Sequence, residues 1–257
     1  MPEHEQTTGY PRKSTEANSE DAAAAQGQRQ IGTPGAPVQL AVYDFDGTSI
    51  TGNSPVLLVA YMMRRGMLKM SVLFRILLWA FAYKVRLPQD ECSVRSLVFT
   101  AFAGKPKEEV DCFLREFYDD RIAPRFRKGC DESMRDHRAQ GHVVLIVSAT
   151  FEPIIERAHE VHPFDYQIST RMATDAEGFY TTRVKGNPVE GEEKPRAISR
   201  FADERFGEGK WELKYAYGDH HSDRPMLFAA TQAFAVTPDW PLAWTAHRQG
   251  WSILKWV

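Results

Sequence analysis

Acidic side chains gather at two points of this 257-residue chain, Asp44-Phe45-Asp46-Gly47-Thr48 and Gly218-Asp219-His220-His221-Ser222-Asp223. In an extended turn, residues i and i+2 point the same way, so Asp44 and Asp46 can face one small volume. Two carboxylates at such a short distance repel each other unless a cation lies between them or one of them is protonated. The pair therefore suits a hard cation such as Mg²⁺, with one carboxylate able to attack phosphorus and the other able to transfer protons. The alternative is an Asp-rich turn whose side chains only cap backbone N–H groups.

Other candidate side chains lie further along the chain. Ser148 follows an apolar run, and its hydroxyl and the neighbouring N–H groups could hold a phosphate oxygen or could cap the next helix. Lys194, near the start of a predicted helix, could neutralise phosphoryl oxygens or could be a solvated charge. Asp219 could complete a metal site with Asp44, and Asp223 could hold a metal-bound water or orient Lys194. Both could instead serve the end of a helix.

His220 and His221 lie between those last two aspartates. Imidazole is typical of transition-metal sites, whereas the other candidate ligands are hard oxygens. Adjacent residues also rarely both reach one metal ion. We therefore interpret the two histidines as residues at the edge of the site.

Short apolar runs supply the strands that would position these groups, at residues 40–43, 143–147, 215–217 and 233–236. Helical patterns at about 131–140, 153–160, 193–206, 222–230 and 240–249 alternate with them. Such alternation predicts an α/β fold, a doubly wound Rossmann-like parallel sheet with helices on both faces. Ligands bind beyond the carboxyl ends of such strands, where the candidate polar groups fall, so we expect those groups to converge.

The remaining segments differ from this core. Residues 1–37 have almost no large apolar side chains and are predicted to be a disordered tail. Residues 53–127 interrupt the alternation and are predicted to form a helical cap inserted after the first strand. That leaves residues 38–52 and 128–257 for the α/β core, with a small hairpin expected within 171–184.

Composition excludes a wholly disordered, a collagen-like and a many-spanning membrane protein. The chain is 43% hydrophobic and 26% charged, and 32 basic residues balance 34 acidic ones, which gives a net charge of −2. This balance provides no global attraction to nucleic acid, so no nucleic-acid partner is expected. Three scattered cysteines indicate reduced thiols and predict a cytoplasmic protein. No feature of the sequence indicates an oligomeric state.

The predicted cap contains a basic and aromatic segment, residues 56–89, with six Lys or Arg and no acidic residue. One interpretation is a cap that packs on the core while its cations are solvated. The other is peripheral binding to a membrane, with aromatic side chains in the lipid and cations on anionic head groups. No uncharged run in the segment is long enough to span a membrane.

The ordered motifs DxDGT, strand plus Ser148, Lys194 and GDxxSD resemble those of the haloacid dehalogenase-like superfamily of phosphohydrolases. More specifically they resemble subclass IB, the phosphoserine phosphatase-like group with a helical cap after the first motif. The resemblance covers about residues 38–257. It implies that Asp44 is the nucleophile and a Mg²⁺ ligand, and that Asp46 is the general acid/base whose backbone carbonyl also binds the metal.

The same resemblance assigns the other positions. It implies that Ser148 and Lys194 hold the phosphoryl group, with Lys194 catalytic, and that Gly47 and Ala149 offer backbone N–H groups. Asp219 would be the second metal carboxylate, with Asp223 close behind it in the metal set. Phosphoserine phosphatases carry a Glu nine residues after the nucleophile, where it contacts the substrate's amino group. Asn53 occupies that position here, and a neutral amide attracts an ammonium much less, which argues against phosphoserine as the substrate.

We therefore predict a Mg²⁺-dependent phosphatase that hydrolyses a phosphomonoester through an aspartyl-phosphate, with a small-molecule or lipid substrate. A phospholipid phosphate phosphatase at the membrane surface, similar to phosphatidylglycerophosphatases, is the first alternative. A non-catalytic binding protein on the same fold is the second.

Overall fold

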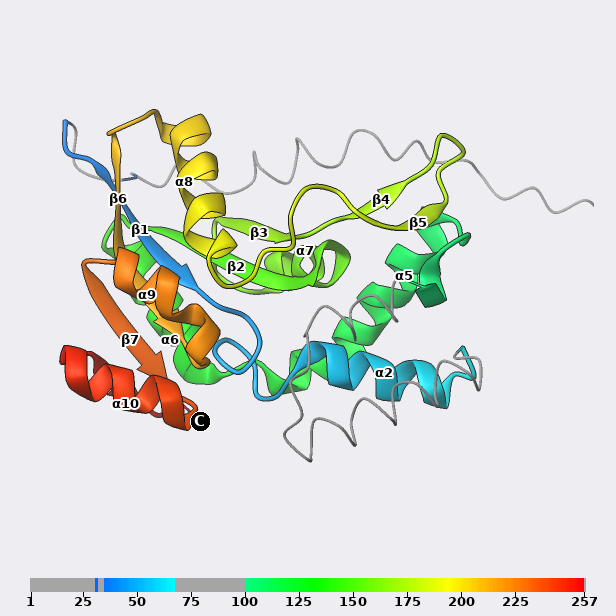
Figure 1. The fold of residues 1–257 in the computed structure, drawn as a ribbon, viewed down its shortest axis with the longest axis horizontal. Coiled ribbons are helices and arrows are strands. Elements are labelled where there is room, and N and C mark those ends of the chain that lie inside the picture. The colour runs from blue at the N-terminus through cyan, green and yellow to red at the C-terminus, as the bar shows by residue number, and fades with distance from the viewer. Residues whose placement is uncertain (1–30, 32–34, 68–99, 257) are drawn as a thin grey trace, which may run out of the picture. The chain divides into compact units, whose positions relative to one another are not determined.

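The computed structural model describes residues 31, 35–67 and 100–256. Most of the predicted tail, and most of the basic segment within the predicted cap, lie outside the described residues. The described chain forms a six-stranded parallel sheet in the order β3-β2-β1-β6-β7-β8 (Figure 1). Its strands are β1 (Val38–Tyr43), β2 (Val143–Phe151), β3 (Tyr166–Thr170), β6 (Trp211–Gly218), β7 (Gln232–Val236) and β8 (Ser252–Leu254).

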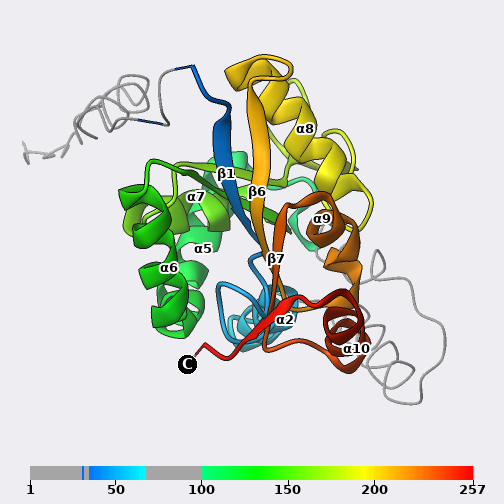
Figure 2. The same ribbon diagram turned by 90° about the vertical axis from the view of Figure 1, so that its left-hand side faces the viewer.

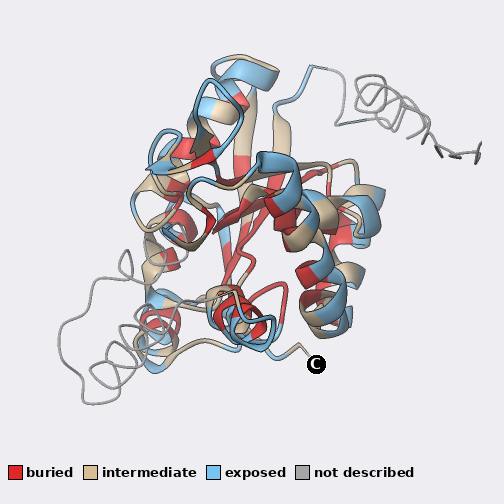
Figure 3. Cartoon of the chain, turned by 90° about the vertical axis from the view of Figure 1, so that its right-hand side faces the viewer, coloured by how far each residue is buried: buried red, intermediate tan, exposed pale blue. Residues whose placement is uncertain are grey.

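Helices cover both faces of this sheet, which confirms the predicted doubly wound α/β fold (Figure 2). One face packs on α6 (Lys128–Ala139) and α7 (Glu152–Val161). The other packs on α8 (Glu193–Phe206), α9 (Arg224–Ala229) and α10 (Trp240–Gln249). The central strands are buried on both sides, as their unbroken apolar runs predict (Figure 3).

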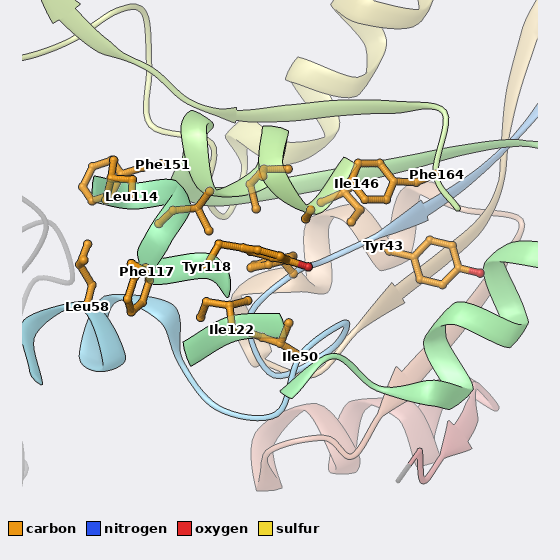
Figure 4. Packing of buried hydrophobic residues seen from close by; sticks show 14 of the residues in the cluster. Tyr43, Ile50, Leu58, Leu114, Phe117, Tyr118, Ile122, Ile146, Phe151 and Phe164 are labelled. Atoms are coloured by element: carbon orange, nitrogen blue, oxygen red, sulfur yellow. The ribbon is translucent and has the colours of Figure 1, made fainter. Parts of the chain in front are cut away.

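The described part of the segment between β1 and α6 is mostly helical. It contains α2 (Ser54–Arg64), α5 (Lys107–Phe117), the π-helical turn η1 (Tyr118–Ile122) and the 3₁₀ turn η2 (Ala123–Arg125). Asn53 caps the start of α2 by accepting a hydrogen bond from the Val56 N–H (3.2 Å). Figure 4 shows apolar side chains of this segment packed together with those of β1 and β2. The division into core and cap domains stays a prediction.

A two-stranded antiparallel sheet lies apart from the main one. It pairs β4 (Met172–Thr174) with β5 (Tyr180–Val184) and confirms the hairpin expected within 171–184. The turn contains Gly178 at a φ of 86°, a conformation that glycine adopts at no steric cost.

Aromatic rings stack across the centre of the sheet. The ring centroids of Tyr43 and Tyr217, on neighbouring strands, lie 4.3 Å apart, and those of Tyr217 and Phe234 lie 4.7 Å apart. His137 of α6 approaches the same stack, with its Nε2 2.8 Å from the Tyr217 hydroxyl and its Nδ1 2.9 Å from Nδ1 of His142. Burial and the neighbouring His142 lower the pKa of His137 to about 4.

This shift predicts a loss of stability in acid. The ordinary pKa of an unfolded histidine is about 6.5, so the unfolded chain binds a proton more readily than the folded one. The contribution of neutral His137 is therefore complete above about pH 6.5 and falls by about 3 kcal/mol as the pH drops to 4. In urea unfolding, His137→Gln should flatten that part of the pH profile relative to wild type. Parallel profiles for the two proteins would contradict the assignment.

Candidate active site

Three carboxylates from distant parts of the sequence meet at the carboxyl edge of the sheet. Asp44 directly follows β1, Asp219 directly follows β6, and Asp223 ends the 3₁₀ turn η3 (His221–Asp223). The two strands are neighbours, and the Asp44 N–H donates to the Tyr217 carbonyl at 2.9 Å. One oxygen from each of the three carboxylates lies within 4.8 Å of the others. The structure therefore brings Asp44, Asp219 and Asp223 together as the sequence predicts.

Lys194 joins this cluster from the first turn of α8. Its side chain is 5% exposed, and its Nζ donates to Oδ1 of Asp44 at 2.5 Å and to Oδ1 of Asp223 at 2.6 Å. Burial alone would lower the pKa of Lys194, but Asp223 and Asp44 raise it overall, so the ammonium stays charged. A solvated lysine is thus excluded, and the suggestion that Asp223 orients Lys194 agrees with the geometry.

Burial is the largest influence on the pKa of Asp44 and on that of Asp219. It raises the pKa of Asp44, Lys194 opposes that shift, and Asp223 and Asp219 add to it. Burial and repulsion from Asp223 raise the pKa of Asp219 to about 7, although Thr48 donates to its Oδ1 at 3.0 Å. Three mutually repelling oxygens at this spacing are the ligands that a hard divalent cation prefers, so the residues fit Mg²⁺.

Asp46 occupies a different environment from Asp44. Its Oδ1 accepts from the Ser54 N–H (2.5 Å), and its Oδ2 accepts from the Ser54 hydroxyl (2.9 Å) and the Thr150 hydroxyl (2.7 Å). Burial raises the pKa of Asp46, and these hydrogen bonds only partly oppose the shift. A carboxyl whose pKa is raised can exist as the acid and can donate a proton, which suits general acid/base work.

The contacts of Ser54 and Thr150 with Asp46 were not predicted. Ser148 was expected to be a candidate helix cap, but β2 continues to Phe151, and α7 begins after it without a side-chain cap. The Thr150 hydroxyl is therefore free to reach Asp46, as well as the Ser54 hydroxyl at 2.7 Å. No spacing signal in the sequence links residues 46, 54 and 150.

Replacing Thr150 with valine should lower kcat about 10- to 100-fold, the cost of one hydrogen bond to a charged group. Thr150 lowers the pKa of Asp46, so its loss should also move the alkaline limb of the kcat/KM profile to higher pH. Thr170→Val is the matched control, because the Thr170 hydroxyl is buried and has no partner among the described residues. Equal losses in both variants would contradict a role for Thr150 in positioning Asp46.

Glycine is required where the first motif approaches the metal cluster. Gly47 has a φ of 80°, and a Cβ built there would lie 2.0 Å from Oδ2 of Asp219. The predicted phosphate contact of its N–H is untested, and in the structure that N–H donates to the Gly52 carbonyl at 3.0 Å. A phosphate could bind the Gly47 N–H only if this hydrogen bond opened.

The other predicted substrate contacts are placed as follows. Ser148 is 1% exposed, and its Oγ accepts from the Thr150 N–H at 3.0 Å, which leaves the hydroxyl hydrogen available. Ala149 follows it within β2. The Asn53 side chain accepts at the start of α2, so its carbonyl oxygen is already engaged as a helix cap. The substrate roles of these residues stay predictions.

A comparison with protein families decides the family. The model of the haloacid dehalogenase-like hydrolases matches residues 41–227, nearly three quarters of the chain. This chain is a haloacid dehalogenase-like hydrolase. The matched region contains Asp44, Lys194, Asp219 and Asp223, so the cluster described above lies within the part that defines the family.

Two similar proteins have names that describe them as phosphatases. A histidinol-phosphatase of Neisseria meningitidis serogroup C (strain 8013) is 30% identical over 151 residues, which are 58% of this chain and 68% of that protein. A probable phosphatase of Mycobacterium tuberculosis (strain ATCC 25618 / H37Rv) is 29% identical over 242 residues, 90% of this chain and 81% of that protein.

Solved structures share the fold of this hydrolase. A protein of unknown function from Bordetella pertussis Tohama I has a TM-score of 0.76 at 23% identity, covering 85% of this chain and 99% of that one. A phosphoserine phosphatase solved as a phospho-aspartyl intermediate analogue has a TM-score of 0.55 at 19% identity, covering 85% of this chain and 93% of that one. The second comparison supports the phosphoserine phosphatase-like fold predicted from the motifs.

Proposed function

We propose that this phosphatase of the haloacid dehalogenase-like family hydrolyses a phosphomonoester with Mg²⁺, through an aspartyl-phosphate on Asp44. The observation that carries the proposal is the convergence of Asp44, Asp219, Asp223 and Lys194 at one edge of the sheet. A non-catalytic binding protein would have no need to hold so many buried charges beside a second carboxyl with a raised pKa.

Each charged group has a role in the proposed reaction. Asp44, Asp219 and Asp223 would hold Mg²⁺, as would the backbone carbonyl of Asp46. The ion, when bound, supplies positive charge that stabilises the transferring phosphoryl oxygens. Lys194 adds a fixed charge beside Asp44, and Ser148 donates a hydrogen bond to the phosphoryl group.

The covalent steps use the two aspartates of the first motif. An oxygen of Asp44 attacks phosphorus, and the bond between phosphorus and the substrate's ester oxygen breaks. Protonated Asp46 gives its proton to that departing oxygen. The resulting Asp46 carboxylate then takes a proton from water, whose oxygen attacks phosphorus and releases Asp44 and phosphate. Asp46 is protonated again at the end of the cycle, so the proton balance closes.

The identity of the alcohol is a narrower proposal. The named relative acts on histidinol phosphate according to its name, and we include amino-alcohol phosphates among the candidates. The Asn53 side chain carries no charge for an ammonium group, which argues against phosphoserine and requires other groups to hold the amine of any amino-alcohol phosphate. The lipid alternative depends largely on residues outside the described part of the chain. Within the described part, no helix is both long and apolar enough to cross a membrane. A cytoplasmic location and peripheral membrane contact stay predictions.

A phosphate-release screen tests the proposed function. Purified protein with Mg²⁺ is given p-nitrophenyl phosphate, histidinol phosphate, phosphoserine, sugar and nucleotide monophosphates, and vesicles that contain phosphatidylglycerophosphate. We expect turnover that stops with EDTA and returns with Mg²⁺. Absence of turnover on every substrate by folded, Mg²⁺-loaded protein would contradict the proposal, and turnover confined to vesicles would establish the lipid alternative.

A further inference from the structure

Two histidines and one aspartate form a second cluster beside the carboxylates described above. His220 and His221 follow β6, and Asp239 precedes α10. Nδ1 of His221 lies 2.9 Å from Oδ2 of Asp239, and Nε2 of His220 lies 3.6 Å from the same oxygen. One ligand atom from each of the three residues falls within 4.8 Å of the others. The mechanism proposed above uses none of these three side chains.

The backbone explains how adjacent histidines reach one point. His220 is extended, with φ of −113° and ψ of 152°, and the 3₁₀ turn begins at His221. This change of direction turns both rings toward Asp239, with ring centroids 4.0 Å apart. Adjacent histidines were expected rarely to reach one metal ion, and in this loop both rings approach the same carboxylate oxygen.

Hydrogen bonds outside the cluster fix which atoms face inward. The Ser222 N–H donates to Nδ1 of His220 at 3.4 Å, and the Ser222 hydroxyl lies 2.9 Å from the same nitrogen, which leaves Nε2 of that ring toward Asp239. Oδ1 of Asp239 accepts from the Leu242 N–H at 2.8 Å, which leaves Oδ2 toward the histidines, where it also accepts from the His221 N–H at 3.3 Å. Contacts to the second ring nitrogen fix how a histidine ring is oriented. The side chains of His220, His221 and Asp239 are 36%, 51% and 27% exposed, so an ion can enter from solvent.

We propose that His220, His221 and Asp239 bind a divalent transition-metal ion such as Zn²⁺, at a site separate from the Mg²⁺ carboxylates. Bonds of 2.0 to 2.1 Å in a tetrahedral Zn²⁺ site place neighbouring ligand atoms about 3.3 Å apart. The observed separations of 2.9 and 3.6 Å bracket that value. Two imidazoles select Zn²⁺, Co²⁺ or Ni²⁺ over Mg²⁺, and the exposed side leaves the fourth position to water.

Zn²⁺ titration of untagged, full-length protein tests the proposal. Calorimetry is run with millimolar Mg²⁺ present, so that the carboxylate cluster is already filled. We expect one Zn²⁺ per chain, and an affinity at least about 10-fold weaker in His221→Gln and in His220→Gln. His247→Gln removes an exposed histidine outside the cluster and should change nothing. Asp44→Asn alters the Mg²⁺ carboxylates and should leave Zn²⁺ binding intact.

Co²⁺ provides a second readout that does not depend on catalysis. Visible absorption bands of tetrahedral Co²⁺ should appear in wild type with Mg²⁺ present and disappear in the two histidine variants, whose folding is checked by circular dichroism. The proposal is overturned if wild type takes up no more Zn²⁺ than His221→Gln, or if Zn²⁺ binding is lost in Asp44→Asn. Because these readouts measure metal binding alone, they are independent of whether the proposed phosphatase reaction is correct.

Discussion

Asparagine in place of Asp44 should reduce kcat by at least about 10⁴-fold, because the amide cannot act as the nucleophile toward phosphorus. The residue is buried beside Lys194, and one of its oxygens lies within 4.8 Å of oxygens of Asp219 and Asp223. Steady-state hydrolysis of p-nitrophenyl phosphate with Mg²⁺ measures the loss. Acid quenching of wild type during turnover should also trap a phosphorylated chain, which intact-mass analysis detects and which Asp44→Asn should lack.

Asparagine has nearly the shape of aspartate, so the variant is expected to fold. Its thermal unfolding and circular dichroism serve as the control, and Asp44→Ala guards against activity recovered by deamidation. Wild-type turnover in folded Asp44→Asn, or a phosphorylated peptide that excludes residue 44, would contradict the assignment of the nucleophile.

Replacing Lys194 with methionine should destabilise the metal-free protein by about 3 to 5 kcal/mol, because two buried carboxylates lose their shared counter-charge. Asp44 and Asp223 each accept a hydrogen bond from the lysine, and all three side chains are nearly inaccessible to solvent. Urea unfolding in EDTA measures the change. Turnover should also fall by at least about 100-fold, because the fixed positive charge beside the phosphoryl group is gone.

A double variant separates the structural role of Lys194 from its catalytic one. Lys194→Met with Asp223→Asn removes one of the two stranded charges, so part of the lost stability should return while turnover stays low. If Lys194→Met were as stable as wild type without metal, the three groups would not form the buried ion cluster seen here. If the double variant recovered full turnover, Lys194 would not be catalytic.

The central strands were predictable because burial on both faces leaves a simple pattern. Residues 40–43 and 143–147 are continuous apolar runs, and the structure confirms them as parts of β1 and β2. The outer strands β3 and β8 were not predicted. The first of these reads Tyr-Gln-Ile-Ser-Thr, with polar residues among the apolar ones and its first three residues only partly buried, and the second has only three residues. Edge strands carry weaker burial patterns, so composition alone does not distinguish them from loops.

The convergence of acids in the site followed from topology. Parallel strands deliver their carboxyl ends to one edge, and this rule alone places Asp44 near Asp219. The hydrogen-bond partners of Asp46 could not be predicted from topology. They depend on the path of the chain from Gly52 into α2 and on the continuation of β2 to Phe151, neither of which has a distinctive residue pattern. The same limit applies to the two adjacent histidines, whose rings meet because of one local backbone turn.

Ser54 is both the first residue of α2 and the donor of two hydrogen bonds to Asp46. The pKa of Asp46 therefore depends on the position of α2. A displacement of Ser54 would remove two hydrogen-bond donors from the Asp46 carboxylate and so raise its pKa. A bulky substrate alcohol that displaces α2 would therefore raise the pKa of Asp46 without contacting a reacting atom.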